Sequence, residues 1–218
     1  MAVQQFLMMG RAAAGRTIFT GQRWAALENG QGELGLGNTS ETTVMTRLGT
    51  QTYWQNTESP GQGGDNRSVV NSEGKLYVWG RNNSGVLGLG DTTQRTSPVQ
   101  VGTDTDWLEA GCTSGACAAI KTNGTLWTWG ENGTGALGQN NTTTTNSPAQ
   151  VGSDTDWAHV LPMSSNLDAL FLMDNAGGIY YSGTGTQGLG NVSTFTQIGS
   201  EEGFVDACMI GFGVVAWK

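Results

Sequence analysis

The chain has 218 residues and a net charge of −8, with 18 acidic residues against 10 lysines and arginines. No basic cluster is present, which argues against nucleic acids and anionic membranes as partners, because phosphate groups are bound by concentrated cations. Apolar residues make up 37% of the chain, 35 residues are glycine and no long amphipathic helix pattern occurs, so the composition indicates a turn-rich all-β protein.

Neither a membrane span nor an export signal is predicted. The longest apolar run, from Met209 to Trp217, is too short to cross a bilayer. The first residues lack the charged segment and the apolar stretch of a secretory signal. We therefore expect no membrane insertion and no export through such a signal.

The first residues of the chain are expected to be structured. Residues 6–10 read FLMMG and correspond to WLEAG at residues 107–111, a segment that is expected to form a strand. Residues 16–19 then correspond to the strand that pairs with it. The chain is therefore expected to begin inside a repeating unit, without a free arm.

A strand followed by a glycine-rich turn is the motif around which the chain is organised. Residues 124–138 read GTLWTWGENGTGALG, in which the aromatic and β-branched residues favour a strand. The glycines that follow permit positive φ angles in a turn. Residues 74–88 are a close second copy, and degenerate copies occupy residues 21–35 and 178–190.

These copies recur at a nearly fixed period. Successive turn leucines are 53, 50 and 52 residues apart, at Leu34, Leu87, Leu137 and Leu189. The flanking segments repeat as well, since residues 97–107 and 147–157 are almost identical. A period of about 50 residues indicates a repeat architecture such as a solenoid or a propeller.

The repeat resembles that of the regulator of chromosome condensation family. That family combines a Gly-x-Leu-Tyr-x-Trp-Gly strand, an Asn-x-x-Gly-x-Leu-Gly turn, a Pro-x-x-Val segment and an Ala-Ala-Gly strand, and residues 74–138 carry nearly all of this pattern. Repeats of this family form the blades of a β-propeller. The resemblance therefore implies a propeller over essentially the whole chain, while a shared fold leaves the function open.

A single domain over residues 1–218 is expected, with about four full blades and an extra two-stranded half blade. The repeating units span about residues 6–54, 54–107, 107–157 and 157–204, and the half unit spans 204–218. Two arrangements remain open. We favour a small closed or nearly closed ring, because closure removes exposed sheet edges; the alternative is an open arc whose edge meets another subunit.

The eight tryptophans and three cysteines are given structural interpretations. Six tryptophans fall on repeat positions and are expected to pack between blades, namely Trp54, Trp79, Trp107, Trp127, Trp129 and Trp157. Three cysteines are too few for a disulfide framework. Cys112 and Cys117 flank a predicted hairpin tip and could bridge in an oxidising setting, but without an export signal we favour two reduced strand residues.

No catalytic site is predicted. His159 is the only histidine, and it occupies a repeat position that holds Glu109 and Asp206 in other units, so we expect a solvent-exposed strand residue. The glycine-rich turns lack the following helix and the Lys-Ser/Thr pair of a phosphate-binding loop. We therefore expect no enzymatic activity and no cofactor.

Metal binding is considered at two pairs of aspartates. Asp104 with Asp106, and Asp154 with Asp156, present oxygen atoms that suit a hard cation. No neighbouring residue completes the coordination, and aspartates in such Gly-x-Asp-x-Asp segments usually form turns through their own backbone. We therefore predict no metal site.

Loop residues are the candidate partner-binding positions. An insertion at residues 59–66 is a surface loop by composition, and residues 139–146 form a polar loop that is not expected to pack. Two aromatic residues beside the insertion are candidates for an anchor, although blade packing also suits the second of them. The candidate residues are Tyr53, Trp54, Gln62, Asp65, Asn66, Arg67, Asn140, Asn141 and Thr143.

The predicted function is that of a non-catalytic structural or interaction module, because rigid propellers with variable loops suit binding. The acidic, Thr/Asn/Gly-rich composition favours a subunit of a larger assembly, in particular a phage virion component such as a capsid decoration or tail-fibre protein. Its expected partners are other subunits, including copies of itself as a homo-oligomer, or a host-surface receptor or glycan. The alternative is a soluble, cytoplasmic regulatory protein of the same repeat type that acts on a GTPase or an enzyme.

Overall fold

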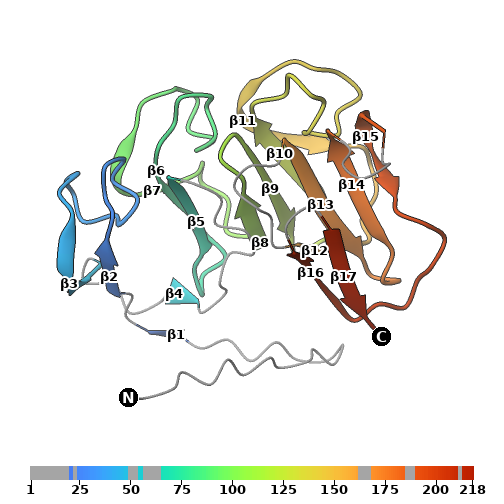
Figure 1. Ribbon diagram of the computed structural model, residues 1–218, viewed down its shortest axis with the longest axis horizontal. Coiled ribbons are helices and arrows are strands. Elements are labelled where there is room, and N and C mark those ends of the chain that lie inside the picture. Colours follow the sequence, from blue (N-terminus) through green and yellow to red (C-terminus); the bar gives the residue numbers. More distant parts are fainter. Residues whose placement is uncertain are drawn as a thin grey trace.

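In the computed structural model, the described residues form antiparallel strands and turns, without a helix (Figure 1). The described ranges are 20–21, 24–48, 54–55, 65–161, 168–184, 190–210 and 213–218. Strands rich in aromatic and β-branched residues alternate with glycine-rich turns, which accounts for this architecture. The predicted all-β class is confirmed.

Two complete four-stranded sheets form the best-defined blades. Blade 3 has the strand order β8-β9-β10-β11. Its strands are β8 (Trp107–Cys112), β9 (Ala116–Lys121), β10 (Leu126–Gly130) and β11 (Thr145–Val151). Blade 4 repeats this order with β12 (Trp157–Val160), β13 (Ala169–Asp174), β14 (Ile179–Gly183) and β15 (Val192–Gln197). Each sheet is a meander in sequence order, as in a propeller blade.

The remaining sheets are partial blades. Blade 2 contains β5 (Asn66–Val70), β6 (Leu76–Gly80) and β7 (Arg95–Gln100). Blade 1 contains β2 (Trp24–Leu27) and β3 (Thr42–Arg47), and half-blade 5 contains β16 (Asp206–Ile210) and β17 (Gly213–Trp217). A short pair joins β1 (Thr20–Gly21) to β4 (Trp54–Gln55).

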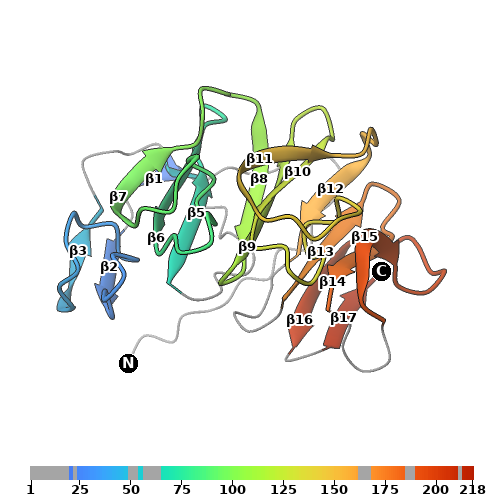
Figure 2. The same ribbon diagram turned by 90° about the horizontal axis from the view of Figure 1, so that it is seen from above.

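The blades stand side by side in an open arc, with blade 1 at one end and half-blade 5 at the other (Figures 1 and 2). The small closed or nearly closed ring that we favoured from the sequence is therefore not formed by the described strands. In a repeat protein the curvature follows from the rotation between neighbouring units, and here that rotation leaves the two end blades apart. The strands expected within residues 6–19 lie outside the described residues.

The strand registers repeat from blade to blade and define equivalent positions. The second and third strands of three blades begin and end their pairing alike, with Asn66 opposite Gly80, Ala116 opposite Gly130, and Ala169 opposite Gly183. Gly130 has a φ of 106°, and a Cβ atom there would lie 2.2 Å from the carbonyl oxygen of Gly115. Only glycine fits this close approach, which explains why each of these strands ends on one.

The hydrophobic core lies between blades rather than inside one sheet. One cluster joins blades 3 and 4, and another joins blades 2 and 3. Trp129 in the second cluster is fully buried, and its Nε1–H donates to the carbonyl oxygen of Val86 in the turn of blade 2, at 2.8 Å. Trp79 repeats this contact one blade earlier by donating to Glu33. The prediction that repeat tryptophans pack between blades is confirmed at these two positions.

The structure corrects our preferred interpretation of the cysteine pair. Cys112 and Cys117 are directly opposite residues of β8 and β9, and a disulfide joins them. Their Cα atoms are 4.1 Å apart, because the hairpin that connects the two strands is short. The absence of an export signal had favoured reduced cysteines, but the hairpin geometry brings the two thiols together.

Candidate functional site

A buried asparagine fixes the glycine-rich turn in each of blades 1, 2 and 3. Asn132 donates from Nδ2 to the carbonyl oxygens of Asn141 and Thr143, at 3.0 and 3.1 Å, and its Oδ1 accepts from the N–H of Leu137 at 3.0 Å. Asn82 and Asn29 make the same set of bonds in blades 2 and 1. The turns are therefore rigid, and they present the same surface on successive blades.

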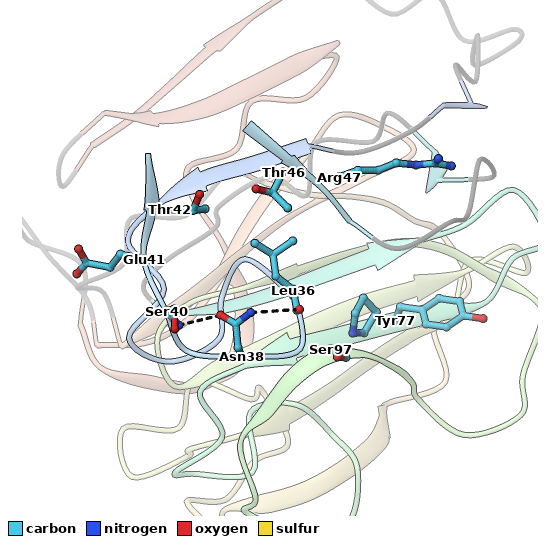
Figure 3. Close-up of a pocket in the computed structure, with 11 residues that line it drawn as sticks. Leu36, Asn38, Ser40, Glu41, Thr42, Thr46, Arg47, Tyr77 and Ser97 are labelled. Carbon is cyan, nitrogen blue, oxygen red and sulfur yellow. Dashed lines mark hydrogen bonds between the residues drawn. The ribbon is translucent and has the colours of Figure 1, made fainter. Parts of the chain in front are cut away.

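A groove of about 560 Å³ lies between blade 1 and blade 2 (Figure 3). We call it groove 1. Its lining combines the apolar side chains of Leu36 and Pro98 with hydroxyl groups from both blades, those of Thr42 and Thr46 on β3 and of Tyr77 and Ser97 on blade 2. In Figure 3, the carboxylate of Glu41 and the guanidinium of Arg47 lie at opposite ends of the residues drawn.

A second groove, of about 510 Å³, lies between blades 2 and 3 and repeats the first. We call it groove 2. Its lining comes from equivalent positions, since Val99 replaces Thr46, Trp127 replaces Tyr77, and Pro148 replaces Pro98. Groove 2 has Leu89 at the position of Leu36 in groove 1, and it also contains Trp107.

The equivalent position between blades 3 and 4 is filled by a side chain. Phe195 of β15 stands where Pro98 and Pro148 stand in the two preceding blades. Its ring lies close to Gly138, where a Cβ atom would be 2.3 Å away, and 5.6 Å from the ring of Trp157. Blade 4 has the small Ser182 at the position of Trp129, and Phe195 occupies this junction instead. Phe195 therefore occupies at this junction the place that is open in grooves 1 and 2.

A buried lysine stands beside groove 2. The ammonium group of Lys121 lies 4.9 Å from the ring centroids of both Trp107 and Trp127, which pack edge to face. It also pairs with Asp104 at 2.6 Å and with Asp106 at 3.0 Å. Burial alone would lower the pKa of Lys121, but the bonds to the two carboxylates outweigh it and raise the pKa. The Asp104/Asp106 pair considered as a cation site thus holds a lysine of the same chain.

The position of the only histidine differs from expectation. Its Nδ1 lies 3.2 Å from Oε2 of Glu109, and this contact joins β12 of blade 4 to β8 of blade 3. The side chain of His159 is half-buried and that of Glu109 is buried. The prediction of a solvent-exposed strand position was wrong for these two residues, because the repeat places them at a junction between blades.

A tyrosine on blade 4 provides a test of the packing at alkaline pH. The hydroxyl of Tyr180 donates to Asp174 at 3.0 Å, and burial together with this carboxylate raises its pKa to about 12. The folded protein therefore retains the phenol proton between its ordinary pKa of about 10 and pH 12. This contribution to stability is fully present below about pH 10 and is lost as the pH rises through about 12.

Phenolate absorbance should show one late-titrating group that disappears in Tyr180→Phe. Titration of every tyrosine near pH 10, with the far-UV circular dichroism still native, would contradict this assignment.

Several predicted site residues serve the fold instead of a free loop. Asn66 is buried, and its Nδ2 donates to the carbonyl oxygen of Thr113 in the neighbouring blade at 3.0 Å. The backbone of Asp65 accepts from Arg81 at 2.8 Å. Arg67 is partly buried and donates to the carbonyl of Asn66, and burial lowers its pKa.

Three further predicted positions lie on the turn of blade 3. The side chains of Asn140, Asn141 and Thr143 are exposed. However, the Asn140 backbone N–H donates to Ser193 of blade 4 at 2.7 Å, and Asn141 and Thr143 are held by Asn132. The loop that was not expected to pack is therefore anchored at both ends, although its side chains remain accessible.

The other candidate positions are described little or not at all. Tyr53 and Gln62 lie outside the described residues, and for Trp54 the structure gives the backbone pairing with Gly21.

Sequence reasoning missed the groove residues. A signal was present in the recurring Gly-Leu and Ser-Pro pairs at residues 88–89, 97–98 and 147–148, but only the structure shows that they face one another across blades.

No group of three or more histidine, cysteine, aspartate or glutamate side chains in the described ranges is arranged to hold a metal ion. Within the same ranges, the structure contains no helix with the length and apolar character that a membrane crossing requires.

Comparison with known proteins supports the repeat assignment. Residues 73–120 and 123–161 match the model of the regulator of chromosome condensation (RCC1) repeat. The chain is 31% identical over 81 residues to the X-linked retinitis pigmentosa GTPase regulator of Canis lupus familiaris, covering 37% of this chain and 8% of that protein. It is 36% identical over 81 residues to the ultraviolet-B receptor UVR8 of Arabidopsis thaliana, covering 37% of this chain and 18% of the receptor. The chain therefore carries RCC1 repeats, and it spans a small part of these relatives.

Solved structures show the same fold. Human WBSCR16 matches with a TM-score of 0.69 at 19% identity, over 87% of this chain and 51% of that one. Prp20p of Saccharomyces cerevisiae matches with a TM-score of 0.65 at 15% identity, over 81% of this chain and 46% of that one. The predicted propeller-type repeat fold is thus confirmed, and the chain spans about half the length of these structures.

Proposed function

We propose that this chain is a non-catalytic protein-binding module of the regulatory type, and that grooves 1 and 2 receive an extended segment of its partner. The observation that carries the proposal is the repetition of the groove at equivalent positions of two neighbouring junctions, while Phe195 fills the third. Ligands commonly bind in preformed hollows with a few convergent polar groups. Rigid turns on both sides support such a site without rearrangement on binding.

The two grooves suit different parts of one partner segment. Groove 1 offers hydroxyl groups from Thr42, Thr46 and Ser97. Thr42 and Thr46 already donate to the carbonyl oxygen of Val44, so their hydroxyl oxygens can accept hydrogen bonds from a peptide backbone or from polar side chains. Groove 2 offers the apolar surfaces of Leu89, Val99 and Pro148, which suit an aliphatic or aromatic anchor. We therefore favour a segment with polar residues followed or preceded by an apolar anchor.

Charge and relatives both favour a protein partner with basic character. The net charge of −8 attracts a positively charged surface and speeds association with it. Prp20p, a structural neighbour, was described together with its binding to Gsp1p and histones, and one relative is named as a GTPase regulator. These names support a GTPase or a basic protein as the partner class of this chain.

The polar side chains described above support a role without catalysis. His159 contacts the buried Glu109 at a blade junction, and Lys121 is held by two aspartates and two tryptophans. These groups stabilise the packing of blades and strands. The predicted phage virion role finds no support in the names of these relatives and stays a prediction.

The proposal can be tested with two purified probes, Gsp1p and histones, in a surface-based binding assay. Thr46→Trp should fill groove 1 and weaken binding at least about tenfold, which corresponds to about 1.4 kcal/mol. Thr196→Trp is the matched control, because it places the same side chain at the equivalent exposed position of β15. Failure of both probes to bind, or equal loss in the two variants, would count against the proposal.

A further inference from the structure

Two lysines of the described chain stand at equivalent positions and are held in the same way. Lys121 is the last residue of β9, the second strand of blade 3, and Lys218 directly follows β17, the second strand of half-blade 5. Lys121 pairs with Asp104 at 2.6 Å, and Lys218 pairs with Glu201 at 2.9 Å. Each of these carboxylates belongs to the link that enters the same sheet, three residues before the aromatic residue that ends the link.

The ammonium group of each lysine also lies over an aromatic ring. Nζ of Lys121 is 4.9 Å from the ring centroid of Trp107, and Nζ of Lys218 is 5.2 Å from that of Phe204. In blade 3 a second ring, that of Trp127, lies at 4.9 Å. A cation is attracted to an aromatic face within about 6 Å. The repeat therefore builds one kind of ammonium site, from a carboxylate of the link and the aromatic residue that follows it.

Blade 4 has the acids and the rings of this site, but an aspartate in place of the lysine. Trp157 lies opposite Asp174 across β12 and β13, as Trp107 lies opposite Lys121 across β8 and β9. The other equivalent positions hold two link aspartates and a tyrosine, namely Asp154, Asp156 and Tyr180. We call these three residues, together with Trp157 and Asp174, the blade 4 site.

The backbone holds the blade 4 site in the same frame as the site around Lys121. The N–H of Asn175 donates to the carbonyl oxygen of Asp156 at 2.8 Å, and the equivalent bond in blade 3 has the same length. The rings of Trp157 and Tyr180 pack edge to face with their centroids 5.1 Å apart, as the equivalent pair of tryptophans does at 6.1 Å. Burial raises the pKa of Tyr180, and so do the carboxylates of Asp174 and Asp156. Both carboxylates therefore lie close to this ring.

The carboxylates of the blade 4 site have no cation of their own among the described residues. Asp154 and Asp156 are exposed, and neither forms an ion pair within the described ranges. Asp174 is buried, and it accepts hydrogen bonds from the hydroxyl of Tyr180 at 3.0 Å and from the N–H of Gly178 at 2.7 Å. These donors are neutral, so they leave a negative charge in a buried position, which is costly without a cation.

The turn after β13 does not require a charged residue at this position. Asn71 stands at the position of Asp174 in blade 2, and its Oδ1 accepts from the N–H of Lys75 at 2.9 Å. Asp174 makes the equivalent bond with Gly178. An uncharged asparagine thus serves the turn equally well. The charge of Asp174 therefore needs another explanation, and the equivalent sites of blade 3 and half-blade 5 indicate an ammonium group.

We propose that the blade 4 site binds a lysine side chain of a partner protein, with the ammonium group placed as that of Lys121 is placed in blade 3. The exposed side chains of Asp154 and Asp156 allow it to approach from the solvent. An ammonium group fits better than a metal ion, because no group of three or more acidic, histidine or cysteine side chains in the described ranges is arranged to hold a metal. Carboxylates and an aromatic face suit a cation carried on a long side chain.

This inference goes beyond the proposed function and does not depend on it. The linings of grooves 1 and 2 contain no residue of the blade 4 site. Thr46→Trp, which fills groove 1, should therefore leave lysine binding at blade 4 unchanged. Failure of the blade 4 site in the experiments below would leave the groove proposal as it stands.

The first experiment titrates an oligolysine peptide with blocked ends into the full chain, by calorimetry at fixed ionic strength. Asp174→Asn should raise the dissociation constant at least about tenfold, while the turn is kept as in blade 2. Asp168→Asn is the matched control, because it removes the same charge at an exposed position just before the same strand, β13. Equal loss in the two variants would indicate general attraction to an acidic protein and would overturn the proposal. So would equal binding of the peptide whose lysines are Nε-acetylated.

The second experiment tests the equivalence of the two blades. Lys121→Gln removes the lysine that fills the site of blade 3, and this variant should bind more oligolysine peptide per chain than the native protein. Lys121→Arg is the matched control, because it keeps a cation in the site. Circular dichroism establishes that both variants are folded. A folded Lys121→Gln protein that binds no more peptide than Lys121→Arg would contradict the proposal, since the same set of groups would then fail to capture a lysine from outside.

Discussion

Trp129→Ala is expected to lower the free energy of unfolding by about 4 kcal/mol, since replacing a buried Phe or Trp by alanine typically costs about 3–5 kcal/mol. The indole is fully buried between blades 2 and 3 and lies against Gly88, where a Cβ atom would be 2.7 Å from Nε1. Its removal leaves a cavity at the junction. It also leaves the carbonyl of Val86 without this hydrogen bond in a buried place, which adds to the loss.

Urea denaturation followed by far-UV circular dichroism measures this change, because the dichroic signal does not depend on the deleted fluorophore. Trp127→Ala is the matched control on the same strand, two residues away. Trp127 is only partly buried, and its Nε1 donates to the hydroxyl of Thr125 at 3.1 Å. We expect the control to lose about 1–2 kcal/mol. Equal losses in the two variants would show that the blade junction does not depend on Trp129.

The fold could be predicted because the same local rules recur in every unit. The regular units have a strand that ends in Trp-Gly and a turn of the form Asn-x-x-Gly-x-Leu-Gly. In these segments glycine permits positive φ angles, and the asparagine side chain holds the turn by hydrogen bonds to its backbone. The angles at Gly85, Gly88, Gly135 and Gly138 are all positive, from 67° to 82°. Repetition then averages out the ambiguity that a single short strand would carry.

The candidate site was less accessible to sequence reasoning, because it depends on how blades face one another. Asn66 looked like a loop residue by composition, yet it bonds to Thr113 of the next blade. Glu109 and His159 looked like solvent-exposed positions, yet they meet at a junction. The groove position between blades 3 and 4 is filled because Phe195 stands in place of a proline and Ser182 in place of a tryptophan, and the combined effect of these exchanges is visible only in three dimensions.

Asn132→Ala is expected to lower the free energy of unfolding by about 3 kcal/mol. The side chain is fully buried and makes hydrogen bonds to Asn141, Thr143 and Leu137. Alanine removes all of these bonds and leaves backbone groups unpaired in a turn shielded from water, and each such group costs about 1–3 kcal/mol when it stays buried. The estimate is below the sum because the turn can open locally and let water reach some of these groups.

The loss should be accompanied by faster amide exchange in the turn, and this distinguishes it from the Trp129 variant. Leu137 loses the acceptor of its N–H when Asn132 is replaced, so its amide and those of the following residues should exchange earlier than in the native protein. Asn140→Ala is the matched control, because its side chain is exposed and its backbone N–H still reaches Ser193. Since Asn140 has a φ of 57°, alanine there should cost about 1 kcal/mol from the backbone alone. An Asn132→Ala protein as stable as this control would mean that water replaces the buried amide at little cost, and the rigid turns beside grooves 1 and 2 would then need another explanation.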